Sequence, residues 1–361
     1  MSLNVRKGFM MNKRLNIIGK LLATALIVVL SASCSAIDED LSNCDNDYQV
    51  DYEIRLVTNM SIEMETQLSI VTDAGIAEVL RNHLKNIFTD YAHDVDLSFY
   101  DTQGNQPRLQ HDQHIMDANQ QSYTINLPKR QYKHLAVANV LNNSVVSLLQ
   151  DDFCRTSQLG QTTRDTIDSH TTGLFTARLP MNVLEGVDQQ FKVNLYMVNC
   201  AAALVIDPRK QDVSNIRVYS TGFASQFNIN DSTYTFAAPS PIVRTAELLD
   251  VNSGMRCYCS VNFPSREPYY NGVGSRSVIE TEDPFIAQPG QETLWQFEVY
   301  VWKDGKITKT VLSINKPLRA GQLTIIKGWI TGEGAVQTSD QTVGVSVTLD
   351  WNGGGIYNPD L

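Results

Sequence analysis

Alternation of apolar and polar residues is the main pattern along this chain. From Tyr48 to Leu56 every second residue is apolar, and the residues between are Gln, Asp, Glu and Arg. A period of two places alternate side chains on opposite faces of a β-strand, so this segment predicts a half-buried strand. The same pattern returns at 191–197, 295–301 and 343–351. In the last of these, the apolar face consists of Val343, Val345, Val347, Leu349 and Trp351.

Two further segments add to the β pattern. Ala201–Ile206 is an unbroken apolar run that predicts a buried continuation of the strand before it. The strand that begins at Trp295 reaches Asp304-Gly305 and then continues as a second run to Ile314. Because Asp and Gly tolerate the positive φ angles of a tight turn, these two runs predict a β-hairpin.

One segment has a helical period instead. Between Ala74 and Tyr91 the apolar residues recur at a spacing of three and four, which places them on one face of a helix. Thr72 and Asp73 precede it as possible N-caps. The opposite face is polar, so we expect this amphipathic helix to lie over a sheet.

The elements together predict an all-β protein with two β-sandwich domains, the first carrying one amphipathic helix. Pro180–Gln190 is the best candidate for the linker. We therefore expect domains over 48–186 and 187–361. The longest loop is expected between Pro264 and Gly290, where Pro, Gly, Ser and Tyr concentrate.

The N-terminus has the three zones of a secretory signal. A basic stretch around Met11–Lys20 precedes the apolar run Leu21–Leu30, and small residues lead to Cys34. About ten apolar residues are too few to span a bilayer. A cysteine directly after the small residues predicts lipoprotein processing, with cleavage after residue 33 and acylation of Cys34. Ser31 stands where a lipobox usually has Leu, and Met11 is a better start than Met1.

The net charge limits the classes of partner that the protein can bind. The net charge is −10, and the first 33 residues contribute five positive charges and no negative ones, so the remainder carries −15. Nucleic acids require clustered Lys and Arg, so we expect no nucleic-acid partner. Several acyl chains anchor a protein stably, which makes outer-membrane lipid the expected membrane contact. Residues 34–47 form an acidic leader, which is either a surface-export signal or a solvated spacer.

Few residues in the sequence form a pattern typical of a metal site or a catalytic site. His111 and His114 stand three apart in a polar stretch without helical period, so a solvated loop is favoured over a zinc site. The five cysteines after Cys34 are an odd number, and their pairing stays open. They are Cys44, Cys154, Cys200, Cys257 and Cys259. In Cys257-Tyr258-Cys259 both thiols lie on one strand face, without the second pair that a metal site needs.

Two other segments lack the pattern of a catalytic site. Ser275 is not a nucleophile elbow, because Val273 and Ser277 stand where that motif has glycines. The glycines after Trp351 are more typical of an exit from the last strand than of a cation loop. We therefore predict a non-catalytic protein with no metal and no cofactor.

Several segments together resemble the FimB/Mfa-type fimbrial anchor lipoproteins of Gram-negative gut and oral anaerobes. They are Ser33–Cys44, the strand Tyr52–Met60, the helix leading into Asp94–Tyr100, and Asn199–Pro208. The resemblance implies two transthyretin-like β-sandwich domains at the base of a fimbria, a tether to the outer membrane, and fimbrial pilin subunits as partners. It also implies that the first strand is kept, together with the lipid.

The resemblance gives the last strand a role without settling where it pairs. An extended segment with alternating apolar side chains fills the groove that a missing strand leaves in a pilin. Val343–Trp351 is either such a donated segment or the last strand of its own sheet. Two other functions remain open: a surface glycan-binding lipoprotein, for which the aromatic cluster would be Pro268-Tyr269-Tyr270, and a fimbrial tip adhesin.

Overall fold

The computed structural model describes residues 47–116, 122–164, 166–267 and 293–350. The described residues from Tyr48 onward belong to one compact unit. In chain order the described elements are β1 (Asp47–Val57), α2 (Met60–Leu68), α3 (Ala74–Ile87), β2 (Asp94–Asp101), β3 (Arg108–Met116), β4 (Ser122–Pro128), β5 (Gln131–Ala138), β6 (Val146–Leu149), η2 (Cys154–Thr156), β7 (Gln158–Gln161), β8 (Thr166–Asp168), β9 (Phe175–Asn182), β10 (Gln189–Met197), β11 (Cys200–Asp207), β12 (Asn215–Thr221), β13 (Gln226–Asn228), β14 (Thr233–Thr235), β15 (Ile242–Arg244), β16 (Ala246–Leu248), β17 (Arg256–Asn262), β18 (Trp295–Lys303), β19 (Lys306–Ile314), β20 (Leu323–Ile330), β21 (Val336–Thr338) and β22 (Val343–Asp350).

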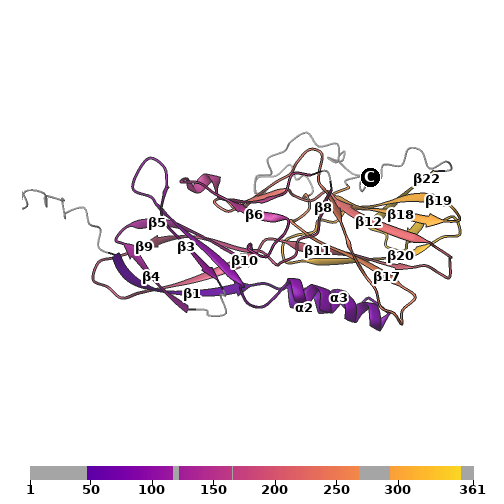
Figure 1. The fold of residues 1–361 in the computed structure, drawn as a ribbon, viewed down its shortest axis with the longest axis horizontal. Coiled ribbons are helices and arrows are strands. Elements are labelled where there is room, and N and C mark those ends of the chain that lie inside the picture. The colour runs from indigo at the N-terminus through magenta and orange to yellow at the C-terminus, as the bar shows by residue number, and fades with distance from the viewer. Residues whose placement is uncertain (1–46, 117–121, 165, 268–292, 351–361) are drawn as a thin grey trace, which may run out of the picture. The chain divides into compact units, whose positions relative to one another are not determined.

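Strands dominate, and the predicted all-β sandwich class is confirmed (Figure 1). The strands form a seven-stranded sheet (β3-β2-β5-β9-β10-β1-β4), a six-stranded sheet (β22-β19-β18-β12-β15-β8), a five-stranded sheet (β16-β17-β11-β20-β21) and a four-stranded sheet (β14-β13-β7-β6). The predicted hairpin is confirmed in β18 and β19, whose turn holds Asp304 at φ 52° and Gly305 at φ 73°.

The first predicted strand is confirmed as β1, which pairs in parallel with β10. Its side chains Val50, Tyr52 and Ile54 are buried, and the polar residues between them face outward. β10 lies beyond the predicted boundary at residue 187 yet belongs to the same sheet as β1. The division into two domains therefore stays a prediction. The expected linker is shorter, because β9 continues to Asn182 and β10 begins at Gln189.

The prediction of a single helix is wrong, because two helices follow β1. The predicted helix is confirmed as α3, where the Asp73 carboxylate accepts a hydrogen bond from the Ile76 amide at 2.9 Å. It ends at Ile87 rather than Tyr91. The additional helix α2 buries Met60, Met64 and Leu68, whose spacing of four places them on one face.

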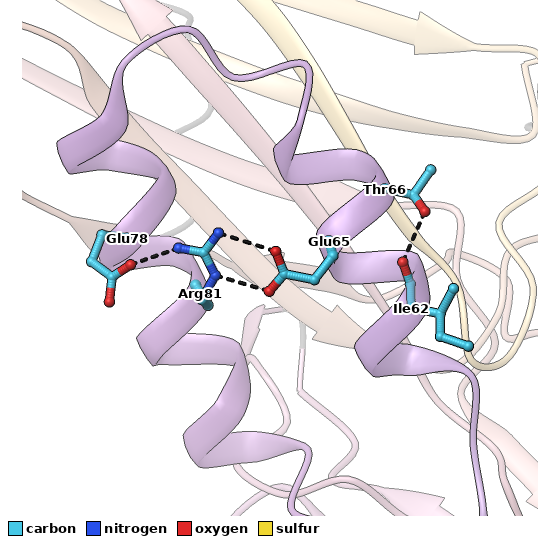
Figure 2. Close-up of polar contacts among 5 residues, drawn as sticks. All are labelled: Ile62, Glu65, Thr66, Glu78 and Arg81. Atoms are coloured by element: carbon cyan, nitrogen blue, oxygen red, sulfur yellow. Dashed lines mark hydrogen bonds and ion pairs between the residues drawn. The ribbon is translucent and has the colours of Figure 1, made fainter.

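The two helices are joined by an ion-pair network on their exposed side (Figure 2). The Arg81 guanidinium of α3 donates to both carboxylate oxygens of Glu65 on α2, at 2.9 and 3.1 Å, and to Glu78 at 2.6 Å. Hydrogen bonding to Arg81 holds the pKa of Glu65 below its usual value. The buried faces of both helices pack on the five-stranded sheet, α2 against β20 and α3 against β17.

β11 is buried on both faces. Ala201, Ala203 and Val205 face the core that the helices and the seven-stranded sheet share. Cys200, Ala202, Leu204 and Ile206 face the second core, which lies between the five-stranded and six-stranded sheets. The five-stranded sheet is therefore the common wall of two cores, and the predicted burial of Ala201–Ile206 is confirmed.

A buried polar pair holds β1 in its sheet. The Tyr52 hydroxyl of β1 bonds to Nε2 of His134 on β5, and His134 Nδ1 donates to the Ser98 carbonyl at 3.0 Å. The His134 ring is fully buried and stacks on Phe99, with ring centroids 4.2 Å apart. Both ring nitrogens of a neutral histidine are thus satisfied, with Tyr52 as the donor to Nε2.

We predict that Tyr52→Phe lowers the free energy of unfolding by about 1–3 kcal/mol, because it leaves buried Nε2 of His134 without a donor. Tyr48→Phe is the matched control in the same strand, since no hydrogen bond of its hydroxyl is found in the described structure. Urea unfolding of the two variants measures the difference. Equal stabilities would show that the Tyr52–His134 bond contributes nothing.

Stability is also expected to depend on pH. Burial lowers the pKa of His134 to about 4 and that of His170 to about 3. The unfolded chain, with ordinary histidine pKa values, binds these protons first as the pH falls below about 6.5. The contribution of neutral His134 is thus complete above this pH and declines by up to about 3 kcal/mol toward pH 4. Unfolding of the wild type and His134→Gln at pH 7.5, 5.5 and 4.5 should show a steeper loss for the wild type, and parallel curves would contradict this.

Candidate functional site: the C-terminal edge strand

The last predicted strand forms the edge of the six-stranded sheet. β22 pairs antiparallel with β19 over eight residue pairs, from Ile307–Asp350 to Ile314–Val343, without a break in register. Of the two alternatives for this segment, the structure has β22 in its own sheet. Trp351 lies outside the described residues, and the strand ends at Asp350.

The apolar face of β22 becomes more exposed along the strand. Val343 is 8% exposed and packs in the second core, and Val345 is partly buried against the same core. Val347 continues this face but is 39% exposed. Gly344 and Ser346 are exposed on the opposite face. The first half of β22 is therefore held by the core, whereas an apolar side chain in the second half meets solvent.

The outer edge of β22 lacks the features that usually protect an edge strand. Among the described strands, only β19 pairs with it. Its sequence VGVSVTLD contains no Lys, Arg or Pro, and its pairing has no bulge. Edge strands of soluble proteins are commonly blocked by such residues or bulges, because free N–H and C=O groups recruit further strands. This edge can therefore accept an extended partner by backbone hydrogen bonding.

A hollow of about 550 Å³ lies beside this edge. Its lining comes from the turn between β20 and β21, from β21 and from β22; the residues are Thr331, Gly332, Glu333, Ala335, Gln337 and Val347. We call it the β22 hollow. The alternating pattern predicted Val347 as a strand-pairing residue. It did not predict the other five lining residues, because they lie beside β22 only after the two sheets pack together.

Other predicted residues lie elsewhere. Cys34 and Cys44 fall outside the described residues, as do Tyr269 and Tyr270 of the glycan-binding alternative. The side chain of Leu349 is likewise not described, although its backbone pairs with Thr308. Within the described ranges, no helix combines the length and apolar character needed to cross a membrane.

The prediction that His111 and His114 lie in a solvated loop is wrong. Both belong to β3, an edge strand of the seven-stranded sheet. The sequence did not predict this strand, because its residues are mostly polar. His114 Nδ1 bonds to the Asp96 carboxylate at 2.6 Å, while burial raises the pKa of Asp96. In the described part of the chain, no three His, Cys, Asp or Glu side chains are grouped to hold a metal ion.

The four described cysteines are free and buried: Cys154, Cys200, Cys257 and Cys259. Cys257 and Cys259 share one face of β17, as the alternation predicts, and both point into the first core. Burial raises the pKa of Cys257 to about 12 and that of Cys259 well above its usual value. These thiols act as small apolar side chains of the core rather than as nucleophiles.

Comparison with known proteins identifies the family to which this chain belongs. A family model described as fimbrillin-A associated anchor proteins Mfa1 and Mfa2 matches residues 43–241. The chain belongs to this family, and its role is therefore associated with fimbriae at the cell surface. No curated protein matches the sequence.

Two solved structures to which the chain is similar at low identity follow. The fimbrial anchor protein Mfa2 from Porphyromonas gingivalis is 11% identical with a TM-score of 0.43, over 84% of this chain and 97% of that one. A fimbrial assembly protein from Parabacteroides distasonis is 10% identical with a TM-score of 0.39, over 84% of this chain and 100% of that one.

We predict that Val343→Ala lowers the free energy of unfolding by about 2 kcal/mol, because it removes buried methyl groups from the second core. Val251→Ala is the matched control, since Val251 is 96% exposed. Its effect should stay within about 0.5 kcal/mol. Thermal or urea unfolding measures both. A neutral Val343→Ala would mean that β22 does not pack in its own sheet in solution.

Proposed function

We propose that this chain tethers a fimbria to the outer membrane. Acyl chains on Cys34 hold its N-terminal end in the lipid, and the outer edge of β22 pairs with an extended strand of a pilin subunit. Among the described strands the outer edge of β22 has no partner, and this edge carries the proposal, because its backbone groups match what strand addition requires. The family match supports the fimbrial partner.

The paired state of β22 favours edge addition over donation of the strand. Leaving the sheet would break eight residue pairs with β19 and would take Val343 and Val345 out of the second core. Addition of a strand at the outer edge keeps these interactions and satisfies the free edge as well. The protein then acts as a template for the first pilin strand while remaining folded.

The anchor at Cys34 is tested in fimbriated cells. Cys34→Ala should move the full chain and its fimbriae from the membrane fraction to the medium, because the acylated residue is lost. Cys44→Ala is the matched control, since it makes the same change ten residues further on. Mass spectrometry of the wild type should find an acylated N-terminus at Cys34. Membrane retention of the Cys34→Ala chain would contradict lipid tethering.

A disulfide staple tests the mode of strand pairing. Val311 and Ser346 are directly paired across β19 and β22, and opposed residues of antiparallel strands lie about 4.5–5.5 Å apart, within the range of a disulfide. Oxidised Val311→Cys/Ser346→Cys should retain fimbriae on cells as well as its reduced form does. Loss of fimbriae on oxidation, restored by a reductant, would show that β22 must leave its sheet.

A further inference from the structure

The β22 hollow has a fixed wall. The Thr331 amide donates to the Ala335 carbonyl at 2.8 Å, and the Gly334 amide donates to the Thr331 carbonyl at 3.0 Å. The same turn is tied to β19, because the Thr308 hydroxyl donates to the Glu333 carbonyl at 3.1 Å. Gly334 has a φ of 86°, a conformation that favours glycine. These hydrogen bonds therefore fix the shape of the turn on the side of the hollow that faces β22.

The lining combines two apolar residues, Ala335 and Val347, with one charged residue. Val347 is the apolar residue from β22, and its exposed surface continues the core-facing side of that strand. Glu333 is the single charged residue of the lining. Its side chain is exposed, and no ion pair of its carboxylate is found in the described structure. A ligand at this place thus gains from an apolar group near Val347 and from a positive charge near Glu333.

Strand geometry connects the hollow with the free edge. Side chains of a strand alternate between two faces, so a strand added beside β22 directs every second side chain toward the core. Directly paired side chains lie about 4.5–5.5 Å apart between Cβ atoms, so one of them comes next to Val347. That side chain enters the space between β22 and the β20–β21 turn, where Val347 is 39% exposed.

We propose that the β22 hollow is the specificity pocket for the pilin strand. It receives one apolar side chain of that strand against Val347, and Glu333 pairs with a Lys or Arg of the same strand. This inference rests on the proposed function and adds the chemistry of the partner. A strand fits better than a small molecule, because the hollow opens along a free β edge and has only two apolar lining residues, Ala335 and Val347.

Site-specific photo-cross-linking in fimbriated cells tests the pocket. The full chain carries a photoreactive phenylalanine analogue either at Val347, on the core-facing side, or at Ser346, on the opposite face. Mass spectrometry then identifies the linked peptide. We expect the Val347 probe to link to a pilin segment with alternating apolar residues and a nearby Lys or Arg.

The two positions distinguish the pocket from strand pairing in general. Linking of pilin from Ser346 alone would keep the proposed function and overturn the pocket. Absence of pilin links from both positions would overturn both. Links from Val347 to residues 351–361 of the same chain, or to a second copy of the chain, would assign the hollow to those occupants and also overturn the pocket.

Charge variants give an independent readout. Glu333→Lys should lower the number of cell-bound fimbriae about tenfold, which corresponds to about 1.4 kcal/mol of binding free energy. Glu333→Gln should give a smaller loss, because it removes the attraction without adding repulsion. Asp188→Lys makes the same charge reversal on an exposed loop between β9 and β10 and should have no effect. Unchanged fimbriation by Glu333→Lys would overturn the charge pairing.

Discussion

The burial of β11 on both faces is the constraint on which the rest of the structure depends. All side chains from Cys200 to Ile206 are buried, and alternate ones belong to two different cores. Three alanines in this strand let the layers on both sides approach closely. The helices α2 and α3 can then cover one face of the five-stranded sheet while the six-stranded sheet covers the other. A charge or a large side chain in β11 would disturb both cores at once.

This layered arrangement also determines what the C-terminal strand can do. The second core holds Val343 and Val345 and thereby keeps β22 in register with β19. β21, in the opposite sheet, has only three residues, so the sandwich is incompletely closed beside β22. Val347 lies at this gap and is 39% exposed. The unpaired edge of β22 and the hollow thus arise at the same place, where the five-stranded sheet ends at β21 and the six-stranded sheet ends at β22.

The sequence predicted those features that local patterns encode. The period of two located β1 and β22, Asp304-Gly305 located the hairpin, and Asp73 marked the start of α3. It missed α2, whose short apolar face follows directly after a strand, and β3, whose edge position allows polar residues. The sequence did not determine which strand β22 pairs with, because the alternation of apolar and polar residues is the same in either sheet. The sequence did not indicate a role for Glu333, because this residue comes close to Val347 only when distant segments of the chain pack together.

In the proposed function, β22 remains in its sheet and offers its outer edge to a pilin strand. Hydrogen exchange of the β22 amides, in the free protein and in assembled fimbriae, tests it most directly. In the free protein, amides bonded to β19 should be protected and those facing outward should exchange rapidly. In fimbriae both sets should be protected. Loss of protection of the amides bonded to β19 on assembly would contradict the account, because it would show that β22 leaves its own sheet.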